Sequence, residues 1–292
     1  MEKIGLIMCK SADLPEEIVQ KHQIKIIPFK SDWPEAEGLP GETTFDIQRE
    51  AERRGIKTFA KTSQPSPKVF LDAYKEMLEK FEEVVCVCIT SKLSGTHNSA
   101  MQAKNFLKPE QKERVFIFDS LNVSGGEALL AFKTFDLIKE GKTGSEIYKI
   151  LEKLQPEILL RVAIADPKWL EASGRVSHMV AEWIRKMQKA GIFPLLGFKK
   201  GLLKPVTIKF GSKDIPTVLF NEIKGKTKKA LSKNKKIKIV ITHGDDIEAA
   251  EKLKSLVEKE MPEAEILFTN LVSDIIGNLT GPDCLVITWV ES

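Results

Sequence analysis

The stretch VVCVCITSKLSGT at residues 84–96 decides the fold of this chain. Its first six residues are β-branched or apolar without alternation, which predicts a strand covered on both faces, as in a parallel sheet. Ser94, Gly95 and Thr96 follow at the point where this strand ends and a helix to about Leu107 begins. Such a turn offers backbone N–H groups, hydroxyls and the positive end of a helix dipole, which together can bind an anion. The alternative is that Ser94 or Thr96 only caps the helix.

The rest of the N-terminal half repeats the same pattern of strand, Ser-rich or Gly-rich turn, and helix. A strand predicted at 115–119 runs into a turn that ends in Gly125 and Gly126, and a helix to about Glu140 follows. The two glycines can admit a ligand closely, or they simply permit the turn. The alternation predicts a doubly wound α/β domain with a parallel sheet flanked by helices.

The second half predicts a separate α/β unit with a mixed sheet. A strand at 158–165 is followed by a hairpin around Lys199, Lys200 and Gly201, and later by a long helix at 215–231. Because the strand directions mix here, we divide the chain into an N-terminal domain at residues 1–157 and a C-terminal domain at residues 158–292.

Composition narrows the class of protein. The chain has 292 residues, of which 42% are hydrophobic and 29% charged, as in ordinary globular proteins. A net charge of +4 does not single out nucleic acid as a partner. The four cysteines lack CxxC spacing and no signal peptide precedes the first strand, so we expect a reduced, cytoplasmic protein. No apolar run reaches the roughly 18 residues of a membrane span, so no integral membrane segment is expected.

Signatures of catalysis are scarce. None of the four histidines has a second ligand at metal spacing, and the chain contains no GxGxxG, GxxxxGK[ST] or GxSxG motif. His97 follows Ser94 too closely in sequence for a nucleophile and its base. We therefore expect no catalytic residue, no metal and no cofactor, and we expect a binding protein rather than an enzyme.

Two groups of basic residues have competing interpretations. The segment 226–238 contains seven lysines, which could bind nucleic acid or an acidic membrane surface. It lacks interleaved aromatic residues and arginines, so a solvated helix end and loop is the preferred interpretation. Arg175, which follows Gly174 in a predicted turn, can fork to a carboxylate or phosphate, or it can pair with a structural acid.

Several short blocks occur together in one order along the whole chain. They are Ala12-Asp13-Leu14-Pro15, Thr62-Ser63-Gln64-Pro65-Ser66-Pro67, Leu93-Ser94-Gly95-Thr96, Asp119-Ser120, Gly174-Arg175-Val176-Ser177, Pro194-Leu195 and Thr280-Gly281-Pro282. In order and spacing these blocks resemble the DegV family of bacterial fatty-acid-binding proteins. The TSQPSP and LSGT blocks are the most specific in combination.

The resemblance implies two α/β domains and a long-chain fatty acid in an apolar tunnel, with its carboxylate hydrogen-bonded at the domain interface. By position, Thr62 and Ser94 are then the hydroxyl donors to that carboxylate. Some family members present the acid to a partner fatty acid kinase, which phosphorylates the carboxylate, and Arg175 matches a position suited to that step. The ligand-binding residues expected on this basis and from the turns above are Thr62, Ser94, Gly95, Thr96, Ser120, Gly125, Gly126 and Arg175.

The chain departs from the family pattern at several positions. Cys9 and Lys10 replace an Asp-Ser pair, Leu279 replaces a histidine, Asp283 replaces a glycine, and an arginine is missing near Phe210 and Gly211. We therefore expect a carrier that binds an acyl chain without serving a kinase in the usual way. The alternatives are a small-molecule enzyme or sensor that binds another carboxylate or phosphate on the same fold, and a nucleic-acid or membrane-surface module.

Overall fold

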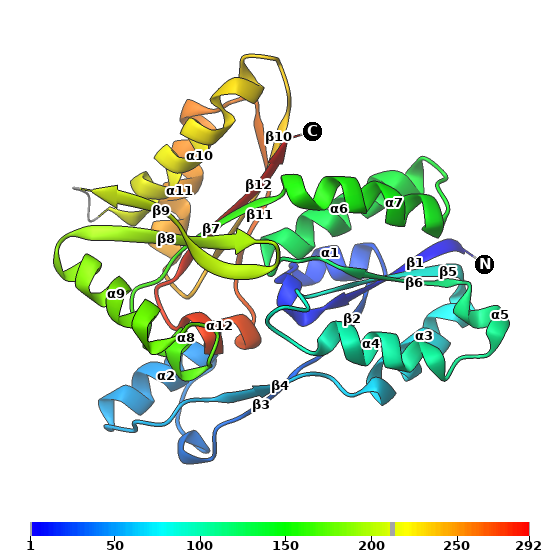
Figure 1. Ribbon diagram of the computed structural model, residues 1–292, viewed down its shortest axis with the longest axis horizontal. Coiled ribbons are helices and arrows are strands. Elements are labelled where there is room, and N and C mark those ends of the chain that lie inside the picture. Colours follow the sequence, from blue (N-terminus) through cyan, green and yellow to red (C-terminus); the bar gives the residue numbers. More distant parts are fainter. Residues whose placement is uncertain (1, 211–213, 292) are drawn as a thin grey trace. The chain divides into compact units, whose positions relative to one another are not determined.

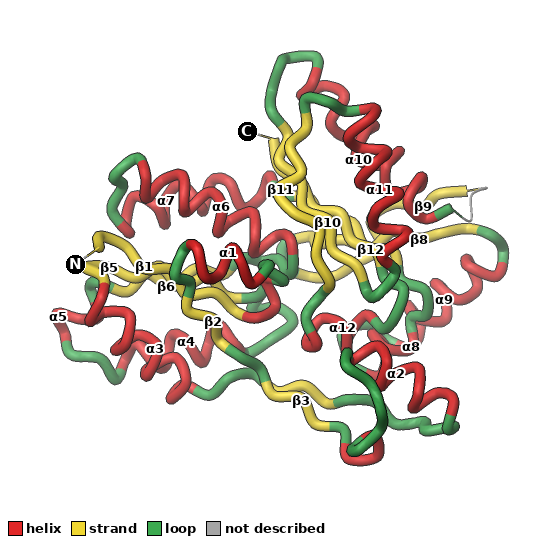
Figure 2. The backbone as a smooth tube through the Cα atoms, turned by 180° about the vertical axis from the view of Figure 1, so that it is seen from behind, coloured by secondary structure: helices red, strands yellow, loops and turns green. Residues whose placement is uncertain are grey.

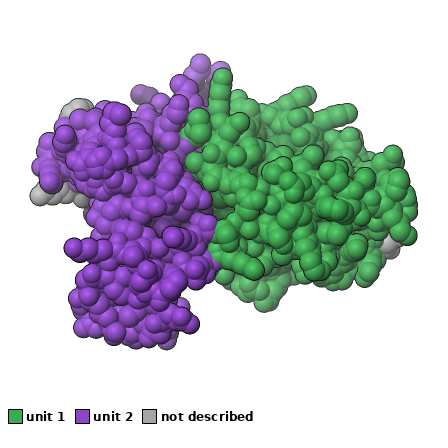
Figure 3. Space-filling view, turned by 60° about the horizontal axis from the view of Figure 1, so that its bottom comes forward, with its two compact units in different colours: residues 1–30, 63–158, 200–202 green, residues 31–62, 159–199, 203–292 purple. Residues whose placement is uncertain are grey.

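The computed structural model describes residues 2–210 and 214–291, and the predicted departure at Gly211 lies outside them (Figure 1). The chain forms two compact units that interleave in sequence (Figure 3). The first unit comprises residues 1–30, 63–158 and 200–202, and the second comprises 31–62, 159–199 and 203–292. The division predicted from the sequence treated each domain as one continuous segment, whereas these units exchange two segments.

The first unit is built on a four-stranded parallel sheet with the order β2-β1-β5-β6. Helices α3 and α4 cover one face and α6 and α7 the other (Figure 1). The elements are β1 (Glu2–Cys9), η1 (Lys10–Ala12), α1 (Glu16–Lys21), β2 (Lys25–Ile27), α3 (Pro67–Lys80), β5 (Phe81–Cys88), α4 (Thr96–Asn105), α5 (Pro109–Lys112), β6 (Val115–Asp119), α6 (Gly125–Lys139), α7 (Gly144–Leu154) and η3 (Gln155–Glu157).

Strand β5 has the apolar sequence pattern of a strand that is covered on both faces. Residues 84–88 are each fully buried, because helices cover both faces of the sheet. Such a strand is apolar at every position, whereas a strand with one exposed face would alternate apolar and polar residues. Tyr74 and Phe70 of α3 pack in the same hydrophobic core as Cys86 and Cys88. The doubly wound sheet predicted from residues 84–96 is confirmed.

The second unit contains a mixed sheet with the order β11-β10-β12-β7-β8-β9. Strand β10 runs parallel to β11 and antiparallel to β12, and β7 runs antiparallel to β12 and β8. Helices α10 and α11 lie along this sheet (Figure 2). The strands are β7 (Leu159–Ala163), β8 (Ile192–Lys199), β9 (Leu202–Phe210), β10 (Ile237–His243), β11 (Ala264–Leu271) and β12 (Leu285–Glu291), and the helices are α2 (Thr44–Arg53), α8 (Lys168–Ala172), α9 (His178–Lys189), α10 (Ile215–Leu231), α11 (Ile247–Glu260) and α12 (Asp274–Thr280).

A buried ion pair joins α10 to the mixed sheet. Arg161 Nε of β7 lies 3.0 Å from Glu222 Oε1 of α10, and Thr207 Oγ1 donates to the same carboxylate oxygen at 2.9 Å. The guanidinium also lies over the Trp289 ring at 5.4 Å. Both charges are buried, so removing them from water is costly. The additional contacts with Thr207 and Trp289 help to offset that cost.

Two parts of the second unit were not expected from the sequence. One is a two-stranded ribbon of β3 (Lys30–Asp32) and β4 (Lys61–Ser63), with η2 (Pro34–Ala36) after β3. Helix α12 was not predicted at all. The lysine-rich segment does form a helix end, because α10 ends at Leu231 and the lysines around that end are exposed. Within the described residues, no helix has the length and apolar character that crossing a bilayer requires.

Candidate functional site

The LSGT turn links β5 to α4, and its two hydroxyls contact each other. Ser94 Oγ lies 2.7 Å from Thr96 Oγ1 and also accepts a hydrogen bond from the Thr96 backbone N–H at 3.3 Å. Thr96 is fully buried, whereas Ser94 is half-buried. The Ser94 side chain therefore does cap the first turn of α4, as the simpler interpretation of this turn expected, and it keeps partial access to solvent.

The TSQPSP block contacts the LSGT block through Gln64. The amide nitrogen of Gln64 donates to Ser99 Oγ of α4 at 3.0 Å. The Gln64 amide oxygen lies where a side chain at position 95 would start, since a Cβ built on Gly95 would be 1.8 Å from it. A side chain at position 95 would therefore force the flexible end of Gln64 to move, and the two most specific sequence blocks meet at this point.

Thr62 lies two residues before Gln64, in strand β4 of the second unit. Its side chain is half-buried, while its neighbours Lys61 and Ser63 are exposed. Strand β4 pairs with β3, so the backbone of this segment is held by a two-stranded ribbon. The role of Thr62 as a head-group donor stays a prediction.

The turn between β6 and α6 is closed by its own side chains. Ser120 Oγ donates to the Asn122 carbonyl at 2.9 Å and accepts from the Asn122 N–H at 3.1 Å. The Asn122 side chain fills the space beside Gly126, where an added Cβ would lie 2.3 Å from Asn122 Cγ. Ser120, Gly125 and Gly126 are all buried. In this structure they serve the turn, and their ligand-binding role stays a prediction.

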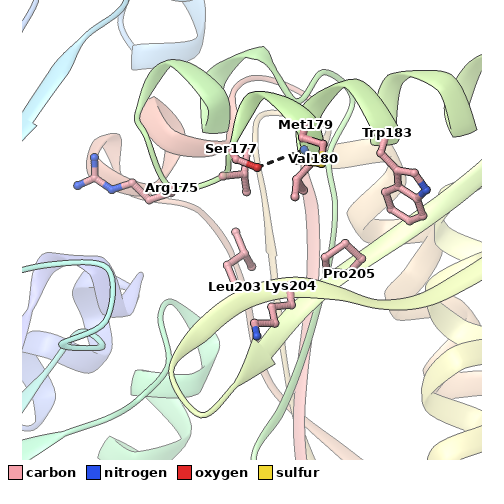
Figure 4. A pocket seen from close by; sticks show the side chains of 9 residues that line it. Arg175, Ser177, Met179, Val180, Trp183, Leu203, Lys204 and Pro205 are labelled. Atoms are coloured by element: carbon pink, nitrogen blue, oxygen red, sulfur yellow. Dashed lines mark hydrogen bonds between the residues drawn. The ribbon is translucent and has the colours of Figure 1, made fainter.

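An apolar groove of about 600 Å³ opens between α9 and the beginning of β9 in the second unit (Figure 4). From α9 and the turn before it, Val176, Val180 and Trp183 face the groove, and the facing strand contributes Leu203 and Pro205. Its volume falls in the range of roughly 300–1,000 Å³ that small-molecule sites span.

The two ends of this groove differ in polarity. In Figure 4, Arg175 lies at one end of the groove with its side chain extending away from Leu203 and Pro205, and the Trp183 indole lies at the other end. Arg175 Nη1 donates to the Ser173 carbonyl at 2.5 Å. Burial lowers the pKa of the Arg175 guanidinium, although arginine remains charged at neutral pH.

The helix that forms one wall of the groove is attached to α8 by a charged cluster. Glu171 of α8 accepts from His178 Nδ1 at 2.5 Å and forms an ion pair with Arg185. Arg185 also pairs with Glu182 at 2.6 Å. The hydrogen bonds from His178 and Arg185 lower the pKa of Glu171. His178 and Arg185 thereby connect α9 to α8.

Helix α12, which precedes the Thr-Gly-Pro segment, is held by polar side chains from distant parts of the chain. Asn278 accepts from Thr44 Oγ1 at 2.7 Å and donates to Ser31 Oγ at 2.9 Å, and Gln48 donates to the Gly277 carbonyl at 3.0 Å. Leu279, at the position where the resemblance implies a histidine, is half-buried on this helix.

A second departure from the family pattern has a structural partner. Asp283, which stands where the family has a glycine, lies 2.9 Å from Arg49 Nη2, and Arg49 Nη1 lies 2.5 Å from Asp245. These contacts raise the pKa of Arg49. Asp283 is thus engaged in a surface ion pair between α2 and the loops that flank β10 and β12.

Sequence reasoning missed the groove, although a signal was present. Val176, Val180 and Trp183 are three or four positions apart, and this helical spacing is the same for a groove wall and for a core-facing helix. The side chain of Met179, on the same helix, is 78% exposed. Of the groove residues, Arg175, Val176 and Ser177 were singled out beforehand, as part of one sequence block.

Comparisons with known proteins agree on one family. A family model described as "Uncharacterised protein, DegV family" matches residues 3–292. A DegV domain-containing protein from Clostridium acetobutylicum is 32% identical over 183 residues, which is 61% of this chain and 62% of that relative, so the chain spans less than two thirds of the relative's length.

Solved structures share the fold. A DegV family protein from Thermus thermophilus, described for its fatty acid binding, aligns with a TM-score of 0.81 at 22% identity, over 99% of this chain and 100% of that one. A stearic acid-binding protein from Eubacterium ventriosum aligns with a TM-score of 0.83 at 21% identity, over 100% of this chain and 98% of that one. With the family model matching nearly every residue, this chain belongs to the DegV family.

Proposed function

We propose that this protein binds a long-chain fatty acid and that the acyl tail occupies the groove between α9 and β9. The observation that carries the proposal is the mainly apolar lining of that groove, to which Arg175 and Lys204 add two cationic side chains. The fatty acids bound by solved members of the fold support the same ligand class. A shallow polar cavity would instead have favoured a small-molecule enzyme or sensor.

The energetics favour the tail as the main source of affinity. At about 0.8 kcal/mol per buried methylene, a sixteen-carbon tail supplies on the order of 10 kcal/mol of gross driving force. The carboxylate head group then needs hydrogen-bond partners, since an unpaired buried carboxylate would be costly, but it does not have to be bound tightly. A few hydroxyl and N–H donors are enough for that purpose.

For the head group, we propose Thr62 and Ser94 as the hydroxyl donors. Both side chains are half-buried, so each is accessible while remaining shielded from bulk water. Ser94 lies at the beginning of the ten-residue helix α4, whose dipole favours negative charge. The family pattern, carried by the TSQPSP and LSGT blocks, assigns the same two positions.

Mass spectrometry of lipid extracted from the purified protein tests the proposed ligand class. We expect a long-chain fatty acid in the extract. A small polar carboxylate or phosphate recovered in its place would support the enzyme or sensor alternative and would contradict the carrier.

The head-group assignment is tested by Ser94→Ala, with Ser91→Ala as the matched control. Ser91 is an exposed serine in the same turn that the proposal leaves out of the site. We expect Ser94→Ala to weaken fatty acid binding about tenfold, as for loss of a hydrogen bond to a charged group, while Ser91→Ala retains full affinity. Equal affinity of the two variants would remove Ser94 from the site.

A separate experiment addresses the kinase. We propose that this member binds the acyl chain without serving a kinase in the usual way, because Leu279 lacks the titratable ring of histidine. Mixing the purified protein with a fatty acid kinase, ATP and fatty acid should yield little acyl phosphate. Robust acyl-phosphate formation would overturn this part of the proposal and leave the binding function intact.

A further inference from the structure

The hydroxyl pair in the LSGT turn has only one arrangement of hydrogens that satisfies every buried group. Ser94 Oγ and Thr96 Oγ1 are 2.7 Å apart, so one of them donates to the other. Thr96 is fully buried, and among the described residues the structure gives its hydroxyl no hydrogen-bond partner besides Ser94. Which hydroxyl donates therefore decides whether a buried donor is left unsatisfied.

The two possibilities differ in cost. If Ser94 donated to Thr96, the hydrogen of the buried Thr96 hydroxyl would have no acceptor, at a cost of about 1–3 kcal/mol. If Thr96 donates to Ser94, the Thr96 hydrogen is satisfied, and the half-buried Ser94 can direct its own hydrogen outward. The Thr96 backbone N–H also donates to Ser94 Oγ at 3.3 Å, so that oxygen accepts from two sides.

We infer that Thr96 is a positioning residue that orients the Ser94 hydroxyl toward an anionic head group without touching the ligand. By donating to Ser94 Oγ, Thr96 leaves the Ser94 hydrogen as the one that points away from the helix. Hydrogen bonds in such a chain polarise one another, so the Ser94 hydroxyl becomes a better donor to a carboxylate. This inference rests on the proposed binding of a fatty acid, and it changes the role of Thr96 from ligand contact to support.

The test is a double-mutant cycle on fatty acid affinity, using Thr96→Val, Ser94→Ala and the double variant. Valine has nearly the shape of threonine and lacks the hydroxyl. We expect Thr96→Val to weaken palmitic acid binding about fivefold to tenfold, a magnitude typical of a hydrogen bond between neutral groups. In the Ser94→Ala background, Thr96→Val should have no further effect, because Thr96 acts only through Ser94.

Two further measurements separate positioning from a general packing defect. Thr96→Ser restores the hydroxyl and should recover the wild-type affinity. Binding of hexadecanol, which has the same tail and an uncharged head, should fall much less than binding of palmitic acid in Thr96→Val. If Thr96→Val does not fold, Thr96→Ala provides the same comparison without the second methyl group.

The outcomes are distinct. Equal affinity of Thr96→Val and wild type, or additive losses in the double variant, would overturn the positioning role while leaving fatty acid binding standing. Equal losses for the acid and the alcohol would also overturn it, since a packing defect weakens both. Failure of the wild-type protein to bind any fatty acid would instead refute the proposed function itself.

Discussion

The amide nitrogen of Gln64 donates a hydrogen bond to Ser99 Oγ at 3.0 Å, with the same Gln64 side chain lying directly against Gly95. This contact joins the TSQPSP block to the LSGT block, and Gly95 lies 31 positions after Gln64 in the chain. Thr62 lies two positions before Gln64 in the chain. The geometry of the turn therefore depends on a glycine and a glutamine that fit each other.

The first prediction concerns this fit. Gly95→Ala would place a Cβ 1.8 Å from Gln64 Oε1, so Gln64 must move and its bond to Ser99 is lost. Because Gln64 is exposed and its flexible end can move, we expect the free energy of unfolding to fall by only about 0.5–1.5 kcal/mol, the net contribution of the lost hydrogen bond. Thermal or denaturant unfolding of the purified variant measures the change.

A matched control and a rescue sharpen this prediction. Gly225, in the middle of α10, has no atom within 4 Å of an added Cβ, so Gly225→Ala should be neutral or stabilise by up to about 1 kcal/mol. In a Gln64→Ala background, Gly95→Ala should cost less, because the space is then free. An unchanged cost in that background would show that Gln64 is not the obstacle.

The second prediction concerns the buried carboxyl of Glu127 in the first turn of α6. Burial, with Cys9, Asp13 and Asp119 nearby, raises the pKa of Glu127 well above its usual value, although the hydrogen bond from Ser11 at 2.8 Å opposes this. The folded state therefore holds a proton that the unfolded chain releases above about pH 4.

The sign of the pH dependence follows. The stability linked to this proton is present below the unfolded pKa of about 4 and is lost as pH rises toward the higher folded pKa. Glu127→Gln mimics the protonated carboxyl, so it should be more stable than wild type at about pH 8 and differ little at about pH 4. Glu140→Gln, an exposed change at the end of the same helix, serves as the control. A wild-type advantage at high pH would contradict the buried neutral state.

The third prediction compares a buried and an exposed ion pair on α10. Glu222→Ala leaves the Arg161 guanidinium buried without its carboxylate and should destabilise the protein by about 3–5 kcal/mol. Glu260→Ala breaks the exposed pair with Lys224, whose atoms are 3.1 Å apart, and should cost less than about 1 kcal/mol. Denaturant unfolding of both variants gives the comparison, and similar costs would mean that burial does not govern the Arg161 pair.

The fourth prediction tests the groove as the site of the acyl tail. If the tail lies along α9, each added methylene should raise affinity about fourfold until the groove is filled. Trp183→Ala removes the indole that lines the end of the groove opposite Arg175 and should weaken binding of long acids more than short ones. Lys186→Ala, at an exposed position on the same helix, should leave the series unchanged. Equal losses across all chain lengths would move the tail away from Trp183.

Much of the fold could be predicted because its signals are local. The helix predicted at 215–231 and the strand predicted at 115–119 have the same bounds in the structure. Helix α12 could not be predicted, because a seven-residue segment with Gly277 and Asn278 has weak intrinsic preference for a helix. It is held by side chains more than 200 positions earlier in the chain, such as Thr44 and Gln48.

The candidate site was predictable only in part. Ser94 and Arg175 were identified because a polar turn after a buried strand and an arginine after glycine are visible in sequence. The roles of Gln64 and Thr96 were not visible, since they depend on distances of 3.0 Å to Ser99 Oγ and 2.7 Å to Ser94 Oγ. The groove wall could not be told from the core, because an apolar stripe has the same helical period in both settings.

From the sequence alone, continuous apolar strands and the order of short motifs were enough to establish a two-domain α/β fold and membership of the DegV family. Only the tertiary structure decided which apolar helix face lines an open groove and that residues 31–62 belong with the second unit. The physical reason is range: hydrophobic period and turn chemistry act between near neighbours in the chain, whereas cavities and buried hydrogen bonds form between residues that only folding brings together.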